Sequence, residues 1–182
     1  MIDLLRTRRS IRKYTRKPVD RNAIDVLVEA LLRSPTSRNG KSWTFIVVDD
    51  RELLSELSKA KEQGSHHLRN APLGIVVCAD STKSDVWVED CSIAAILVQM
   101  TAHALGLGTC WIQIRNRNHS ETMPAEHYIQ NLLGLPPHIK VECVVSIGYP
   151  DEVKNPVADS ELEYGKVKHN HYSRTYLSKR GP

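Results

Sequence analysis

The sequence predicts an α/β or α+β domain in which helices pack around one sheet. Its 182 residues fit one compact domain with room for a sizeable core. Stretches with the apolar period of helices alternate with short apolar stretches typical of buried strands. One helical stretch, over about residues 85–105, is apolar nearly all round, so it belongs at the centre of the fold or of an oligomer.

The first predicted helix begins at Asp20, a residue type that caps helix N-termini. Its apolar residues recur at helical spacing, namely Ile24, Leu27, Val28, Leu31 and Leu32. Pro35 ends this helix and opens a loop over residues 35–40, where small polar and turn-forming side chains gather. The apolar residues 43–48 then predict a strand.

The second helix is expected to begin at Asp50 and to end near Gly64. Residues 73–79 are apolar throughout and predict a buried strand. The long central helix over 85–105 follows, and the Gly-Leu-Gly sequence at 106–108 closes it. This order of elements predicts that each helix connects two strands of the sheet.

The last part of the domain contains a third strand at 109–114, a short helix at 124–133 and a fourth strand at 140–147. We assign residues 1–150 to this domain. Residues 151–182 form a polar extension with scattered apolar anchors, namely Val153, Val157, Leu162, Tyr164, Val167, Tyr172 and Tyr176. Such an extension could hardly fold alone, so we expect it to pack on a partner subunit and predict a homodimer.

Basic residues concentrate near the N-terminus. Seven of the twelve residues from 6 to 17 are basic, namely Arg6, Arg8, Arg9, Arg12, Lys13, Arg16 and Lys17. The chain holds 25 Lys+Arg and 21 Asp+Glu, so the other residues have 25 − 7 = 18 against 21 and are slightly acidic. A focused cluster indicates contact with a few phosphates rather than with nucleic acid. On charge alone, a solvated basic arm is the alternative.

Several other functions are disfavoured. The N-terminus lacks the apolar core of a secretory signal, which predicts a cytoplasmic protein, and polar residues interrupt the apolar stretch 91–114, so no membrane partner is expected. The four cysteines include no Cys-x-x-Cys pair, which predicts reduced, buried thiols, and no zinc-ligand spacing occurs. Neither a P-loop nor a Gly-x-Ser-x-Gly elbow is present, and the glycines at 106–108 precede a strand, unlike a Rossmann turn.

Four motifs occur in an informative order. They are Arg-Arg-Ser-Ile-Arg-Lys-Tyr at 8–14, Ser-Pro-Thr-Ser-Arg-Asn-Gly-Lys-Ser-Trp at 34–43, Ala-His-Ala-Leu-Gly-Leu-Gly-Thr-Cys-Trp-Ile at 102–112 and Ile-Gly-Tyr-Pro at 147–150. Together they resemble the FMN-dependent nitroreductase family, and the resemblance covers residues 5 to about 172. Lys41 and Ser42 depart from it, since Gln-Pro is usual there.

The resemblance implies an α+β fold, a three-layer sandwich whose central, mostly antiparallel sheet is flanked by helices. It also implies an intertwined homodimer with two FMN sites at the interface, and it places the first motif on the opening helix. Residues 1–150 would then be the FMN-binding domain, and residues 151–182 would lie on the partner.

The resemblance also implies roles for individual residues. Arg8, Arg9 and Ser10 would hold the FMN phosphate, because guanidinium groups bind phosphate oxygens in pairs. Arg12 would lie at the N1/O2 edge of the flavin, where a cation favours the reduced ring.

Other motifs would complete the site. The partner subunit would contribute Pro35, Thr36, Ser37 and Asn39. The backbone of Cys110, Trp111, Ile112 and Gln113 would run along the ring, with an amide near Gln113 directed at flavin N5; core packing is the alternative role for Cys110 and Trp111.

The basic pair that the family places after the last strand is missing here, where Ala-Asp-Ser-Glu occupies 158–161. Lys166 or Lys168 would replace it, unless Arg6 and Lys13 suffice.

The implied activity is that of an FMN-dependent oxidoreductase. NADH or NADPH would reduce FMN at N5, and the electrons would pass in an alternating half-reaction to a small-molecule acceptor such as a nitroaromatic or a quinone. No side chain need act as a catalytic acid or base. The alternatives are a flavin-binding carrier or regulatory protein without turnover and, more remotely, a nucleic-acid-binding arm.

Overall fold

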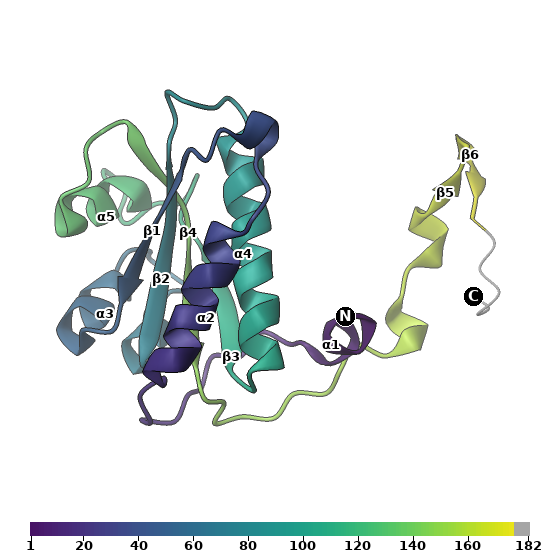
Figure 1. Cartoon of the computed structure of the whole chain (residues 1–182), viewed down its shortest axis with the longest axis horizontal. Coiled ribbons are helices and arrows are strands. Elements are labelled where there is room, and N and C mark those ends of the chain that lie inside the picture. Colours follow the sequence, from purple (N-terminus) through teal and green to yellow (C-terminus); the bar gives the residue numbers. More distant parts are fainter. Residues whose placement is uncertain (177–182) are drawn as a thin grey trace.

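A four-stranded sheet lies at the centre of the computed structural model, which describes residues 1–176 (Figure 1). Its strands are β1 (Trp43–Val48), β2 (Leu73–Asp80), β3 (Gly108–Gln113) and β4 (Ile139–Gly148). They lie in the order β1-β2-β4-β3, and every neighbouring pair is antiparallel. β3 and β1 are therefore the two edges of the sheet.

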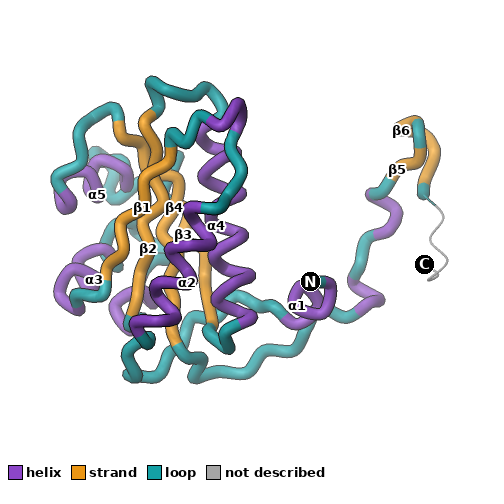
Figure 2. The backbone as a smooth tube through the Cα atoms, viewed as in Figure 1, coloured by secondary structure: helices purple, strands orange, loops and turns teal. Residues whose placement is uncertain are grey.

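Helices cover both faces of this sheet, as Figure 2 also shows. One face packs against α2 (Arg21–Leu32) and α4 (Trp87–Ala104), and the other against α3 (Arg51–Leu57) and α5 (Ala125–Leu133). Alternate residues of β2 enter the two cores, Val77 on the α2 and α4 side and Val76 on the other, so the whole strand is buried. The predicted α+β three-layer sandwich is confirmed.

Local sequence explains two of the helix ends. The Asp50 side chain accepts a hydrogen bond from the Leu53 amide at 2.7 Å and so caps α3, while Gly134 takes the left-handed conformation that ends α5. The prediction that the second helix reaches Gly64 is wrong, because α3 ends at Leu57. Ser58 and Ser65 donate side-chain hydrogen bonds to backbone carbonyls there, and these bonds compete with a continuing helix.

The N-terminal motif is not helical, contrary to the expectation drawn from the family. Helix α1 (Ile2–Thr7) ends before it, and Arg8 already has extended dihedral angles. From there the chain crosses the start of β3, where the Ile11 amide donates to the Thr109 carbonyl at 2.9 Å. Gly108 makes this close crossing possible, since a Cβ atom there would lie 2.7 Å from Ile11 Cβ.

The C-terminal segment extends away from the sandwich (Figure 1). It carries two short 3-10 turns (Asp159–Glu161 and Tyr164–Lys166) and a small hairpin of β5 (Lys168–His169) and β6 (His171–Thr175). The apolar anchors of this arm are largely exposed, with Tyr172 91% exposed. We call residues 157–176 the arm.

Candidate functional site

The extended residues 8–12, together with the outer edge of β3, form the site; we call residues 8–12 the basic strip. Ser10 makes a parallel bridge with Thr109, which fixes the strip against this edge. Beyond Thr109, no backbone group of residues 1–176 pairs with the outer edge of β3. Its backbone groups thus remain available to a ligand.

The segment that follows β4 forms hydrogen bonds with the strip. Glu152 Oε1 accepts hydrogen bonds from the backbone amides of Arg12, at 2.6 Å, and Lys13, at 3.2 Å. These bonds lower the pKa of Glu152, the bond from Arg12 most. Arg9 also donates to the backbone carbonyl of Asn155. The strip is consequently held in place from two sides.

Lys154 adds a cation to the strip. Its Nζ donates to the Ser10 carbonyl at 2.9 Å and lies 3.5 Å from the Glu152 carboxylate. A cavity of about 320 Å³ is lined by this lysine, by Arg8 and Arg9 and by the start of β3. Sequence reasoning missed Lys154, because it looked for a basic pair further along the chain; the only available signal was the position of this lysine four residues after Pro150.

Three cations act on one buried thiol in β3. Burial raises the pKa of Cys110, whereas the charges of Arg12, Lys154 and Arg8 act to lower it. Arg8 and Lys154 line the cavity at the start of β3, and the Lys154 ammonium is anchored at the Ser10 carbonyl, so both cations lie beside this strand. Cys110 itself is 2% exposed and packs in the core, in line with its alternative structural role.

His67 was also missed by sequence reasoning. Its Nε2 atom is buried and has no hydrogen-bond partner among the described residues. Burial, followed by the charges of Arg12 and Lys61, lowers the pKa of His67 to about 4, so the ring is neutral at pH 7. A neutral imidazole with a vacant buried nitrogen, close to Arg12, is suited to a polar ligand group. The adjacent pair His66-His67 is its mark in the sequence, and no zinc-ligand spacing accompanies this pair.

Gln113 turns its side chain away from the outer edge of β3. Its Oε1 accepts from Trp111 Nε1 at 2.9 Å, and its Nε2 donates to the Arg115 carbonyl at 3.1 Å and to Glu142 Oε1 at 3.3 Å. Burial raises the pKa of Glu142 above its ordinary value. Trp111, Gln113 and Glu142 thus form a chain of side-chain bonds that fixes the end of β3, and Ile112 packs in the core.

The loop with Pro35, Thr36, Ser37 and Asn39 lies elsewhere in the chain. The Ser37 amide donates to Asp90 Oδ1, at the start of α4, whereas the basic strip lies near the end of α4, where Thr7 contacts His103. The 18 residues of α4 span about 27 Å. One chain therefore does not bring this loop to the strip (Figure 1).

Backbone geometry marks the same loop as unusual. Arg38, Asn39 and Lys41 all have positive φ, at 50°, 55° and 46°. Such conformations cost energy for residues with side chains, and they concentrate at binding sites.

Lys166 does not reach the basic strip of its own chain either. It is exposed on the arm, where its ammonium pairs with Glu163. Lys168 likewise bonds within the arm, to the Gly165 carbonyl. Within one chain, Lys154 rather than these two lysines lines the cavity beside the basic strip.

Residues 1–176 contain neither a membrane-spanning helix nor a cluster of metal-binding side chains. No helix there is long and apolar enough to cross a membrane. No cluster of three or more His, Cys, Asp or Glu side chains could hold a metal ion there. All four cysteines are buried and free, as the sequence predicted, and burial raises the pKa of Cys78 to about 12.

Known proteins resemble this chain closely. An FMN-dependent nitroreductase from Clostridium difficile R20291 is 48% identical, with a TM-score of 0.93 over 94% of this chain and 100% of that chain. A relative from Archaeoglobus fulgidus, named as an NADH dehydrogenase/NAD(P)H nitroreductase, is 39% identical over 158 residues, 85% of this chain and 87% of the relative. An FMN reductase [NAD(P)H] from Bacillus subtilis is 29% identical over 82% of this chain and 66% of its own length.

The family comparison agrees with these relatives. Residues 5–66 and 59–149 match the model of the nitroreductase family, and these two segments span the whole sandwich and the basic strip. With the fold, the strip and the relatives in agreement, the chain belongs to the nitroreductase family.

Proposed function

We propose that this protein is an NAD(P)H-dependent flavin oxidoreductase that binds FMN along the basic strip and the outer edge of β3. The observation that carries the proposal is the cavity at the start of β3, which Arg8, Arg9 and Lys154 line and in which the Lys154 ammonium is anchored at the Ser10 carbonyl. The printed names of the relatives, an FMN-dependent nitroreductase and an FMN reductase among them, support the choice of cofactor.

The phosphate end of FMN fits the first half of the strip. Arg8 and Arg9 supply guanidinium groups that pair with phosphate oxygens, and Ser10 supplies a hydroxyl donor. Lys154 is already anchored at the Ser10 carbonyl and adds a third cation. A dianionic group here would offset the repulsion among these like charges.

The ring end of FMN fits the second half. Arg12 supplies a fixed positive charge, and His67 supplies a neutral, buried nitrogen that needs a partner. The unpaired outer edge of β3 near Gln113 supplies backbone donors, while the Gln113 side chain is held behind the strand by Glu142. When bound, FMN accepts hydride from NADH or NADPH and passes electrons to a second substrate.

The residues of this chain contribute position and charge. Arg12 favours negative charge on the adjacent ring, and the hydrogen bond from its backbone amide to Glu152 holds its main chain in place. Among the described residues near the ring end, none is placed as a general acid or base. The acceptor is a nitroaromatic, a quinone or a similar small molecule, and it uses the same open side of the site as the hydride donor, in alternation.

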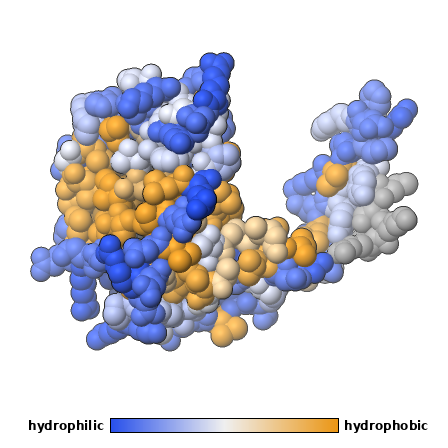
Figure 3. Space-filling view, in the orientation of Figure 1, coloured by the Kyte–Doolittle hydropathy of each residue, from blue (hydrophilic) through white to orange (hydrophobic). Residues whose placement is uncertain are grey.

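The site is completed by a second copy of the chain. The loop with Pro35, Thr36, Ser37 and Asn39 lies too far from the strip to serve its own site, which supports its use in the partner's site. Figure 3 shows apolar surface over β1 and α2, where Val47 is 37% and Leu32 is 56% exposed. A face of this kind and an arm with exposed anchors favour a homodimer.

The proposal is tested on purified protein incubated with FMN and then freed of excess ligand. A yellow protein that oxidises NADH or NADPH when a nitroaromatic or quinone is added would support it. A protein that stays colourless would contradict it. The alternative, a flavin carrier without turnover, predicts a yellow protein whose visible band does not bleach on rapid anaerobic mixing with NADH or NADPH.

A further inference from the structure

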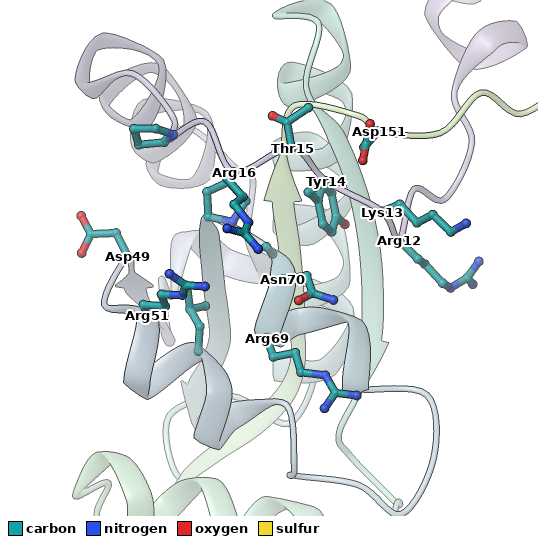
Figure 4. A pocket seen from close by; sticks show the side chains of 14 residues that line it. Arg12, Lys13, Tyr14, Thr15, Arg16, Asp49, Arg51, Arg69, Asn70 and Asp151 are labelled. Atoms are coloured by element: carbon teal, nitrogen blue, oxygen red, sulfur yellow. The ribbon is translucent and has the colours of Figure 1, made fainter.

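A second basic cavity, lined in part by Arg12, adjoins the ring end of the proposed FMN site (Figure 4). It has a volume of about 520 Å³ and lies between residues 12–18, the start of α3 and the 3-10 helix of His66–Asn70. It shares no lining residue with the 320 Å³ cavity around Lys154. The two cavities therefore occupy different parts of the N-terminal segment.

The charge of this cavity is not balanced by the protein. Apart from Arg12, its lining contains four cationic side chains, Lys13, Arg16, Arg51 and Arg69, and two carboxylates, Asp49 and Asp151. Within residues 1–176, no salt bridge and no side-chain hydrogen bond involves any of these six groups, although other arginines of the chain, such as Arg21 and Arg33, pair with carboxylates.

The geometry concentrates this charge around a hollow. Figure 4 shows the Arg16 and Arg51 side chains extending into the space between their two segments, whereas the Arg69 side chain, lower in the view, is directed away from them. Cations that face one cavity repel one another, and an anion placed among them relieves this repulsion. Arginines in particular offer paired donors that match phosphate oxygens.

The floor of the cavity consists of apolar side chains, two of them buried and two of them prolines. Leu54 is 1% and Ala71 is 5% exposed, and Pro18 and Pro72 add rigid apolar surface. A cationic rim over an apolar floor suits a phosphorylated small molecule with an organic body better than a bare ion, and the volume lies in the range of small-molecule sites. A concave hollow is also a poor match for duplex nucleic acid, which favours a basic face.

We propose that this cavity binds the phosphate groups of a nucleotide-sized small molecule, with Arg16 and Arg51 as the phosphate ligands. The cavity shares Arg12 with the proposed FMN site, but neither Arg16 nor Arg51 lines that site. Two sources of phosphate suit the cavity: the hydride donor itself, through the pyrophosphate of NADH or NADPH, and a separate nucleotide.

The test is calorimetric titration of the FMN-treated, full-length protein with inorganic pyrophosphate at low ionic strength. We expect saturable binding at one site per chain and a loss of at least about tenfold in affinity in the Arg16→Ala/Arg51→Ala double variant. The matched control is Arg21→Ala/Arg33→Ala, which removes two exposed arginines of α2 and should bind like the wild type. The absence of saturable heat in the wild type, or equal affinity in the two double variants, would overturn the proposal.

The flavin spectrum and the steady-state kinetics separate the remaining possibilities. If the Arg16→Ala/Arg51→Ala variant keeps its visible flavin band but no longer binds pyrophosphate, the cavity is independent of FMN binding. Failure of the wild type to bind FMN would count only against the proposed function. A rise in KM for NADPH, for NADH or for both in that variant would identify the hydride donor as the phosphate source, because both donors carry a pyrophosphate. Unchanged KM for both, together with binding of adenosine diphosphate that the variant loses, would identify a separate nucleotide.

Discussion

At the scale of single residues, His67 and Lys154 carry the most information about the site, although neither belongs to a motif. His67 leaves one ring nitrogen buried without a partner in the described chain, and Lys154 is held by the carbonyl of Ser10. Each position results from tertiary packing between segments far apart in sequence. The residue pattern around them is ordinary, so the sequence alone could not single them out.

His67 makes the stability of the ligand-free protein depend on pH. Its pKa is about 4 in the folded protein and about 6.5 when unfolded, so unfolding takes up a proton between these values and stability falls as the pH drops through that window. We expect the advantage of the wild type over His67→Gln in urea unfolding to shrink by on the order of 2 kcal/mol from pH 7 to pH 4.

The control for this measurement is His66→Gln, the same change at the exposed neighbouring histidine. If His67→Gln and the wild type lost stability in parallel over the whole window, His67 would not be the titrating group that the structure indicates.

Lys154 should strengthen the binding of the FMN phosphate. Removal of its ammonium in Lys154→Ala is expected to weaken FMN by about tenfold, because a charge-assisted contact is lost, while riboflavin, which has no phosphate, should bind as before. Fluorescence quenching of the two flavins measures both affinities. Lys166→Ala removes an exposed lysine of the arm and is the matched control; a larger effect there than at Lys154 would reverse the assignment.

At the scale of elements, the crossing of the basic strip over β3 holds the site together. It requires a glycine, since Ile11 lies against the position of a Cβ on Gly108, with three of its carbons within 2.9 Å. Ile11 is itself buried at the edge of the core. The contact between Ile11 and Gly108 therefore joins the first family motif to the start of β3.

The Gly108→Ala substitution should displace the strip. We expect a loss of about 1–3 kcal/mol in the free energy of unfolding, from overpacking against Ile11, and weaker FMN binding. Partial recovery in Gly108→Ala/Ile11→Ala would show that the clash is the cause. Gly165→Ala, where an added methyl group meets nothing within 4 Å, should be neutral. Equal stability of Gly108→Ala and the wild type would refute the close crossing.

Elements with a buried face were predictable, and those without one were not. Both α2 and β2 were predictable from their apolar residues. Leu27 and Leu31 recur at helical spacing in α2, and β2 is a continuous apolar run, because burial selects these patterns of apolar residues. Helix α1 and the β5-β6 hairpin bury no residue, so their sequences carry no such signal. The early end of α3 depends on the hydroxyls of Ser58 and Ser65, which bond to carbonyls of the same local segment and so compete with a continuing helix.

At the scale of the whole molecule, one chain does not complete the site that its motifs imply. The strip and the loop at residues 35–39 lie near opposite ends of α4, and the arm extends from the sandwich with its apolar side chains exposed (Figure 1). The family resemblance assigned this loop to the partner subunit, and its distance from the strip within one chain agrees with that prediction. Composition and periodicity alone carry no information on which copy of the chain supplies each part.

Removal of the arm should weaken the dimer. A chain ending at Pro156 retains Glu152 and Lys154, so its strip stays anchored, but it loses apolar anchors such as Leu162 and Val167. We expect sedimentation to show dissociation at concentrations where the full chain is dimeric, with the circular dichroism of the sandwich retained. Identical dissociation constants for the two chains would contradict a role of the arm in assembly.

In the proposed site, cations around the basic strip bind the phosphate of a flavin mononucleotide, and the β3 edge receives its ring. Calorimetric titration of the ligand-free protein with FMN and, in parallel, with riboflavin tests it most directly. We predict saturation at one FMN per chain and an affinity for riboflavin lower by about a hundredfold, the effect of two charge-assisted contacts. No saturable binding of FMN, or equal affinity for the two flavins, would contradict the account.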